Sequence, residues 1–332
     1  MSSDSDEDAD TSLLGELSEL GSAITPILRR LSGARRAIEF LTDGLAGTGA
    51  KALKSRFHRY RTNDLVTEAR QVADATGLPV PVIFDKLVRQ RRIDELTMDA
   101  LRHISKHADV QGNETAEAAE DQENIADSWF QTLYDEASIV NEENVREAFM
   151  RILAGEIQAP GSFSTRTMRV LGAVNQSTAK RFRRAASVSV QLTPDGKHVL
   201  DARIPAINGT LGQNCLSEDG LLYDVLIDMT ESGLLHPDYN CQHPYGPLGL
   251  PFSAQSPQQH LVQVPFVHQS AKWQLIPKAN SKESKPMKVK GAKLTSCGVE
   301  LLKIVDIEDL PNFTAKLSNH FEQSGYQMSR AQ

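Results

Sequence analysis

Glu156 and Arg166 are the charged residues whose placement comes closest to that of a catalytic pair. They flank residues 160–164 (PGSFS), where a carboxylate and a guanidinium beside a Gly-Ser loop could bind a polar ligand. No histidine and no second acid lies between residues 157 and 175. Because such a pair more often braces a turn, the sequence favours a structural role, and we expect no catalytic residue here.

His236, Cys241 and His243 could contribute ligands to a zinc ion, with Cys215 or His260 completing the set. Structural zinc sites usually contain paired short spacings such as C-x2-C, and the sequence has none. The three residues are therefore weak metal candidates, and ordinary loop polarity with a buried cysteine is the favoured interpretation. The motifs G-x-S-x-G, H-E-x-x-H and G-x-G-x-x-G are also absent from the sequence, and we expect no cofactor.

Basic residues gather between positions 166 and 184, directly after an acidic segment. Residues 111–160 hold 12 acids and 2 bases, whereas residues 161–200 hold 1 acid and 7 bases. Two hypotheses follow: the segments pack near each other and offset each other's field, which we favour, or the basic part binds an anionic partner such as nucleic acid. The candidate binding residues are Arg166, Arg169, Lys180, Arg181, Arg183 and Arg184.

Residues 24–61 combine helical apolar spacing with many arginines and lysines. Such a basic amphipathic pattern is typical of a helix on an anionic membrane surface, or of a bundle helix with an Arg-rich outer face, and we favour the bundle. The glycine cluster at residues 44–51 fails as a phosphate loop, since its lysine comes one position too late and no Ser or Thr follows.

Residues 125–187 show helical periodicity at several levels. The apolar faces of four helices begin at Ile125, Val145, Met168 and Ala179, and residues 160–161 (PG) end the second of them. Asn141, Ser162 or Ser164, and Ser177 are the predicted N-caps. Phe163 should plug the groove between the helices. The predicted structural motif comprises Trp129, Phe130, Glu156, Pro160, Gly161, Ser162, Phe163 and Ser164.

This helical core resembles a bacterial family catalogued as domain of unknown function 2806. The resemblance is carried by the Trp129-Phe130 pair and residues 152–156 (ILAGE), 160–164 (PGSFS) and 166–167 (RT), and it covers about residues 125–187. Phe149 stands where many relatives are expected to have tryptophan. A looser similarity to abortive-infection alpha-type proteins implies a phage-defence setting. The resemblance implies a bacterial or phage-borne protein and no particular reaction.

The C-terminal part changes to a mixed pattern. Residues 188–193 alternate, residues 194–196 (PDG) predict a turn, and residues 200–204 form the return strand. Further predictions are a helix over 221–232 capped by Ser217, a long loop over 236–259, strands over 261–267 and 273–276, and an exposed lysine-rich loop over 278–290. A helix from 294 with Thr295 or Ser296 as its cap and a last helix over 311–323 complete the predicted elements. The stretches ESGLL and LTSCGVELL resemble pieces of winged-helix proteins, but helix 221–232 is acidic and does not favour DNA binding.

The sequence as a whole predicts a mostly α protein with a C-terminal α+β part that resembles a winged helix. We expect an acidic disordered tail (1–11), a helical region with basic faces (12–110), an acidic linker (111–124), a helical core (125–187) and an α+β domain (188–332). The apolar runs are too short for a membrane span, no signal peptide is expected, and three cysteines suggest a reducing cytoplasm. The favoured function is a non-enzymatic interaction or regulatory module with a protein partner or self-association; nucleic acid and a membrane surface are the alternatives.

Overall fold

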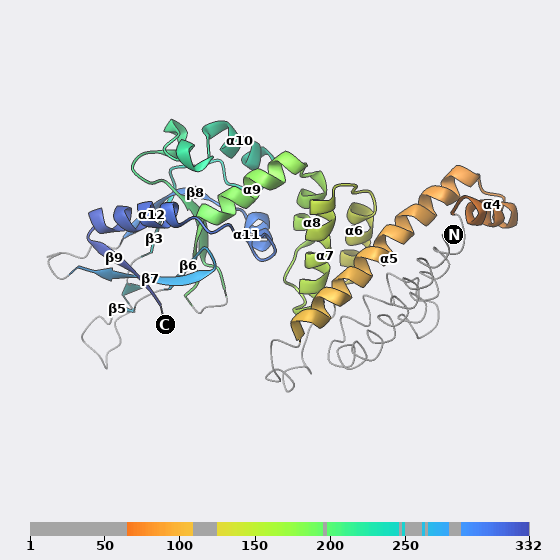
Figure 1. Ribbon diagram of the computed structural model, residues 1–332, viewed down its shortest axis with the longest axis horizontal. Coiled ribbons are helices and arrows are strands. Elements are labelled where there is room, and N and C mark those ends of the chain that lie inside the picture. The colour runs from red at the N-terminus through yellow and green to blue at the C-terminus, as the bar shows by residue number, and fades with distance from the viewer. Residues whose placement is uncertain are drawn as a thin grey trace, which may run out of the picture. The chain divides into compact units, whose positions relative to one another are not determined.

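The computed structural model describes residues 65–108, 125–194, 198–245, 248–249, 261–262, 265–278 and 287–331 (Figure 1). The predicted tail of residues 1–11, the basic region 24–61, the linker 111–124 and the turn at 195–196 lie outside these ranges. The chain divides into two compact units, Met1–Gly172 and Ala173–Gln332. The division falls before the last helix of the predicted core, for which Ser177 was the predicted cap, so this helix belongs to the second unit.

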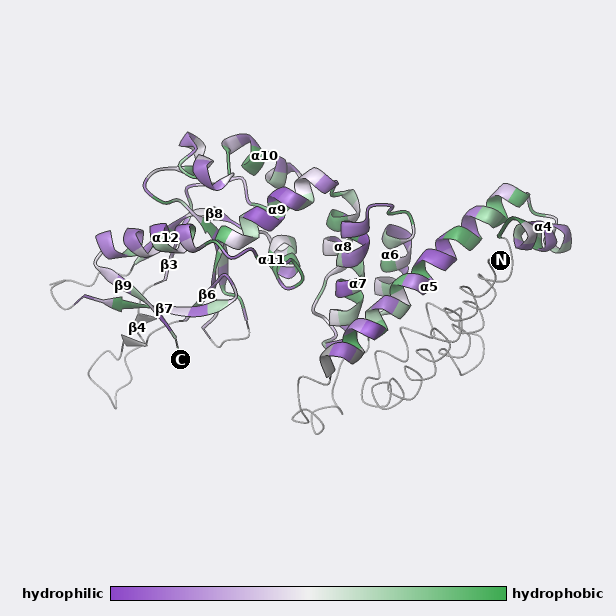
Figure 2. Ribbon diagram, viewed as in Figure 1, coloured by the Kyte–Doolittle hydropathy of each residue, from purple (hydrophilic) through white to green (hydrophobic). Residues whose placement is uncertain are grey.

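The described part of the first unit begins with two helices joined by a short glycine-proline turn. Helix α4 covers Leu65–Thr76 and α5 covers Val80–Ala108. Gly77 ends α4 with φ +72°, a left-handed conformation that glycine adopts without strain. Pro81 lies in the first turn of α5, where its missing N–H has no partner to lose. The predicted break at residues 77–81 is confirmed. Figure 2 shows hydrophilic and hydrophobic stretches alternating along α5.

The rest of this unit is a set of short helices: α6 (Asp127–Ala137), α7 (Glu143–Gln158) and α8 (Thr165–Ala173). The predicted apolar faces are confirmed as the core. On α7 every member of the predicted stripe is at most 2% exposed, and α7 packs against α5 and α6. The buried residues of α6 and α7 include Trp129, Phe130, Leu133, Val145, Phe149, Ile152, Leu153 and Ile157.

The second unit begins with α9 (Gln176–Val188) and is built on an antiparallel sheet with the strand order β3-β8-β2-β1-β6-β7-β9. Its strands are β1 (Val190–Leu192), β2 (Asp201–Pro205), β3 (Gln242–Pro244), β6 (Phe266–His268), β7 (Ala271–Pro277), β8 (Lys288–Lys293) and β9 (Tyr326–Arg330). Strands β4 (Leu248–Gly249) and β5 (Leu261–Val262) pair separately.

Three further helices complete the second unit: α10 (Tyr223–Glu231), α11 (Ser296–Leu302) and α12 (Pro311–Gln323). Helix α9 packs against α10 and β2, and α12 packs against β9. Phe266 on β6 links the sheet to α12, because its ring contacts Phe321 edge-on at 6.0 Å. Fully buried aromatic side chains thus join the sheet and the helix into one core.

Several predictions for this unit are confirmed. The hairpin pairs Val190 with Arg203, Thr295 caps α11 by accepting the N–H of Gly298, and α12 covers the predicted residues. Helix α10 begins later than predicted, at Tyr223; Ser217 instead starts a short 3-10 turn (Ser217–Asp219), so the Ser217 cap was wrong.

The strand content of the second unit exceeds the prediction. Strand β3 lies within the predicted long loop, β8 takes over the end of the predicted lysine-rich loop, and β9 was not predicted at all. The mostly α class with a C-terminal α+β part is confirmed. The winged-helix detail is not confirmed, since the helices accompany a seven-stranded sheet.

Candidate functional site

The PGSFS corner is held by the carboxylate of Glu156. This side chain is 2% exposed at the end of α7, and its Oε1 accepts the backbone N–H of Gly161 at 2.7 Å while Oε2 accepts that of Phe163 at 2.9 Å. Because the corner lies between two helices, these N–H groups have no ladder partner. The charge that sequence reasoning weighed as catalytic therefore closes a loop.

Phe163 plugs the corner as predicted. Its ring is buried, and its carbonyl oxygen accepts a hydrogen bond of 2.7 Å from Nε1 of Trp129 on α6. Gly155 makes room for the ring, since a Cβ there would lie 2.7 Å from Cε2 of Phe163. The glycine of the ILAGE sequence and the aromatic ring of the PGSFS sequence are thus complementary parts of one packing arrangement.

The helix that follows the corner is capped by Ser164 and not by Ser162. The Oγ of Ser164 accepts the N–H of Thr167 at 3.3 Å. Arg166, on the first turn of α8, is exposed and makes no ion pair with Glu156, so the structure does not bring the predicted pair together.

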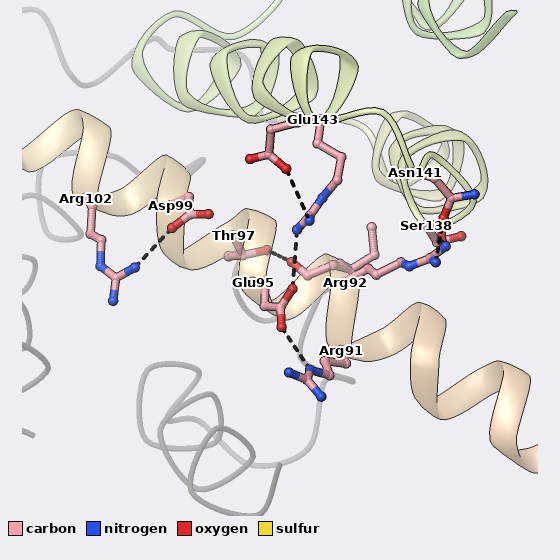
Figure 3. A network of polar contacts seen from close by, with 11 residues as sticks. Arg91, Arg92, Glu95, Thr97, Asp99, Arg102, Ser138, Asn141 and Glu143 are labelled. Carbon is pink, nitrogen blue, oxygen red and sulfur yellow. Dashed lines mark hydrogen bonds and ion pairs between the residues drawn. The ribbon is translucent and has the colours of Figure 1, made fainter. Parts of the chain in front are cut away.

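Arg92 on α5 binds the turn between α6 and α7. Its two terminal nitrogens donate to the carbonyl oxygen of Ser138 at 2.9 Å and to Oδ1 of Asn141 at 2.7 Å (Figure 3). Asn141 was predicted as the N-cap of α7, but the helix caps at Glu142, which makes no side-chain cap bond. The arginine accounts for this difference, since it binds the amide oxygen that a cap would use.

A second set of charges joins α5 to α7. Glu95 accepts from Arg91 at 2.9 Å within α5 and forms an ion pair of 3.3 Å with Arg146 of α7. Arg146 also lies 4.0 Å from Glu143, and Figure 3 shows Glu143 and Arg91 on either side of this cluster. Because these side chains are partly exposed, each pair contributes at most about 1 kcal/mol, so the cluster orients α5 more than it stabilises the unit.

Three of the six predicted binding cations form ion pairs inside the second unit. Arg181 binds Asp228 of α10 at 2.9 Å, while Arg183 and Arg184 share Glu308 at 3.5 and 3.2 Å. The other three are exposed: Lys180 on α9, and Arg166 and Arg169 on α8 in the first unit. Acids therefore offset part of the charge of α9, but they are Asp228 and Glu308 and do not belong to the acidic segment 111–160 that the favoured hypothesis named.

Asn175 caps α9 by accepting the N–H of Thr178 at 2.9 Å. Ser177, the predicted cap, lies inside the helix. The predicted cap was therefore two residues too late in the sequence, and asparagine is one of the strongest N-cap residues.

The weak metal candidates each face different surroundings. The thiol of Cys241 contacts the carbonyl oxygen of Gly291 at 3.1 Å, Nδ1 of His243 contacts that of Pro244 at 3.0 Å, and His236 is exposed. His260 lies outside the described residues. Within the ranges that the structure describes, no group of three or more His, Cys, Asp or Glu side chains is placed to hold a metal ion.

Asp201 and Arg203 form a buried polar centre that sequence reasoning missed. The guanidinium of Arg203 donates to both carboxylate oxygens of Asp201, at 2.6 and 2.7 Å, and Tyr245 donates to the same carboxylate at 2.9 Å. The remaining donors of Arg203 bind the carbonyl oxygens of Cys241 and Val289. All partners are satisfied inside the sheet, which is the arrangement of a structural centre.

The protonation of this centre follows from the same contacts. Burial alone would raise the pKa of Asp201, but the hydrogen bonds and charge of Arg203 outweigh it, so the pKa lies below its ordinary value. Burial raises the pKa of Tyr245 well above its ordinary value, so its hydroxyl stays protonated and donates. The sequence signal was the D-x-R spacing, which places both side chains on one face of a strand.

Helix α10 presents an apolar stripe to solvent. Leu222, Tyr223 and Ile227 are 43%, 41% and 36% exposed, whereas the opposite side of α10 is buried. The ring of Tyr223 contacts Tyr239 edge-on at 5.8 Å. Asp224 and Glu231 lie exposed on the same helix, which carries no lysine or arginine. The stripe is therefore apolar with an acidic border.

The described helices differ from membrane-spanning helices in length or hydropathy. Among them, no helix combines at least 18 residues with enough apolar character to cross a membrane.

The family described as Protein of unknown function (DUF2806) matches residues 86–318, well beyond the helical core that carries the resemblance in the sequence. No curated protein and no solved structure matches the chain. Because the match includes α5, the PGSFS corner and most of the sheet unit, the chain belongs to the DUF2806 family.

Proposed function

We propose that the protein is a non-enzymatic interaction module that binds a partner protein through the α10 surface, defined as Leu222, Tyr223, Ile227, Asp224 and Glu231. The observation that carries this proposal is the exposure of three large apolar side chains on one short helix. Clustered apolar exposure of this kind often marks an interaction site.

The α10 surface is held in a fixed orientation from behind. Val225, Leu226 and Met229 are buried, and Asp228 accepts hydrogen bonds from Arg181 at 2.9 Å and from Thr178 at 3.1 Å of α9. A surface that is already ordered loses less conformational entropy when a partner binds.

The border of the surface indicates the chemistry of the partner. Asp224 and Glu231 are exposed and form no ion pair within the described residues, so they present negative charge beside the apolar stripe. The complementary partner is an amphipathic helix with apolar residues at helical spacing and flanking lysine or arginine.

The test compares variants of the full chain in the native host. A photo-crosslinking residue at position 223 captures the contacting peptide, which mass spectrometry identifies. The Ile227→Asp variant should lose the crosslinked protein, while Ile139→Asp, an equally apolar and exposed position in the first unit, should keep it. Crosslinks to an acidic or non-helical segment, or an unchanged crosslink in Ile227→Asp, would refute the proposal.

In a winged-helix protein that binds DNA, a helix contacts the major groove, and α10 corresponds to the predicted helix of that resemblance. A helix that recognises DNA is basic, whereas α10 carries Asp224, Asp228 and Glu231 and no base. A winged-helix-like role for α10 would accordingly be protein contact, in agreement with the acidic border.

Nucleic-acid binding is the second candidate, and it rests on the predicted cations that are exposed and form no ion pair with any described residue: Arg166 and Arg169 in the first unit, and Lys180 in the second. Binding through them must weaken steeply between low and moderate salt. The membrane-surface alternative rests on residues 24–61, outside the described residues, and liposome flotation tests it. The phage-defence setting is tested by phage challenge of strains with and without the protein.

A further inference from the structure

A pocket of about 540 Å³ opens in the second unit between β8, the end of α12 and the segment after β2. This volume falls in the range of sites for small organic ligands, roughly 300–1,000 Å³. The pocket is separate from the α10 surface and independent of the function proposed for it. Its lining residues are Ala206, Asn208, Gly209, Met287, Lys288, Lys290, His320, Gln323, Ser324 and Tyr326.

The pocket is lined by two lysines and no acid. Lys288 and Lys290 are two residues apart on β8, so the alternation of a strand places both side chains on the same face. Neither lysine forms an ion pair within the described residues. Both lysines therefore border the pocket from one face of the strand, and no carboxylate among the lining residues neutralises their charge.

The negative electrostatic field at the pocket is smaller than the positive field of the two lysines. The last turn of α12 borders the pocket at His320, Gln323 and Ser324, and a helix C-terminus carries about half a negative charge. Burial lowers the pKa of His320, so its imidazole is neutral at pH 7 and adds no positive charge. The two positive charges of the lysines are larger than the partial negative charge of the helix C-terminus, so the electrostatic potential of the pocket is positive.

The remaining lining divides into polar donors and an apolar floor. Asn208 and Gln323 supply amide groups at the rim, while Ala206, Met287 and Tyr326 are at most 6% exposed and form the floor. A phosphate ion alone would leave most of this volume empty. We propose that Lys288 and Lys290 bind the phosphate group of a small organic phosphate, whose carbon part lies on Ala206, Met287 and Tyr326.

Calorimetry on the full chain tests the site with glycerol phosphate and pyrophosphate as probes. Removal of an ammonium that bonds a phosphate costs about tenfold or more in affinity, so Lys288→Gln/Lys290→Gln should lose most of the binding. The matched control is Lys293→Gln, which removes the same charge from the same strand at a residue that does not line the pocket, and it should bind like wild type.

The other outcomes overturn the proposal. These are no binding of either probe at millimolar concentration, equal binding in the double variant, or equal losses in the control, which would indicate a general charge effect. Citrate binding as tightly as the phosphates would reassign the site to carboxylates. A short oligonucleotide that binds where the small probes do not would assign it to a nucleic-acid backbone. Circular dichroism of the double variant confirms that the fold is intact.

Discussion

Removal of the Glu156 carboxylate should destabilise the helical unit. Glu156→Ala leaves the N–H groups of Gly161 and Phe163 without this acceptor; the N–H of Phe163 is buried, and a buried orphan costs about 1–3 kcal/mol, whereas water can reach the N–H of the exposed Gly161. A loss of about 1–3 kcal/mol is a substantial part of the stability of a typical domain. Glu156→Gln keeps one acceptor oxygen and turns an NH2 group toward the second N–H, so its loss should be about half as large.

Tryptophan fluorescence during urea unfolding can report this unit alone. The chain has two tryptophans, and Trp129 donates its indole N–H to Phe163 in the corner itself. In a Trp273→Phe background, the change in fluorescence therefore follows the corner, and the midpoint and slope give the free energy of unfolding.

The control lies on the same helix. Glu147 is a half-exposed glutamate of α7 that pairs with Arg151 at 2.7 Å, and Glu147→Ala should cost only about 0.2–0.5 kcal/mol. If the two alanine variants unfold with free energies within about 0.5 kcal/mol of each other, the carboxylate does not hold the corner and the structural assignment of Glu156 is wrong.

Three further predictions concern the remaining contacts. Phe163→Ala should lower the free energy of unfolding by about 3–5 kcal/mol. Gly155→Ala should destabilise the Phe163→Ala variant less than it destabilises the wild type, because its Cβ then meets no ring. Urea unfolding of both single variants and the double variant measures this coupling. Burial lowers the pKa of His268, so the unfolded chain binds a proton at a higher pH than the folded chain, and the stability of the fold should decrease below about pH 6.5. Thermal melts at pH 7 and pH 5 measure this decrease, which should be smaller in a His268→Gln variant. An equal decrease in the variant and the wild type would show that His268 does not cause it. Asp201→Asn leaves the buried Arg203 without its counter-ion and should lower the stability of the fold by about 3–5 kcal/mol, which thermal melts measure. An unchanged melting temperature would show that the pair does not stabilise the sheet.

The helical core could be predicted because local rules decide it. The stripe on α7 follows a period of 3.6 residues, and residues 160–161 combine a proline with a glycine at φ +84°, so the helix must end there. Phe163 could be assigned to the interior because a large apolar ring in a tight loop has no other stable place. In each case the signal and its effect lie within a few residues of each other.

The sites that could not be predicted depend on partners distant in sequence. Arg92 binds the turn at residues 138–141, and this contact displaces the predicted Asn141 cap. Arg181 meets an acid 47 residues later, so the apparent basic patch of α9 is partly neutral. A charge in the sequence indicates exposure on average, but only the fold shows which charge has found a partner.

Strand β8 was missed for a different reason. Strand β8 is rich in lysine, which lowers strand propensity, yet Val289 and Ala292 between the lysines are buried and β8 pairs with β2 and β3. Gly291 allows this pairing, because a Cβ there would collide with the carbonyl oxygen of Ile204. The position of β8 between two paired strands thus outweighs the low strand propensity of its lysines.

The buried carboxylates of both units have the same use. Asp94 accepts from Gln90, Glu156 closes the corner, Asp201 binds Arg203 and Asp219 binds Lys316, so each lies in a bond that holds its own unit together. A carboxylate that is committed in this way cannot reorient toward a ligand without releasing its partner. Recognition is therefore expected to rest on groups that the fold leaves exposed, and the apolar stripe of α10 and the paired lysines of β8 are two such groups within the described residues.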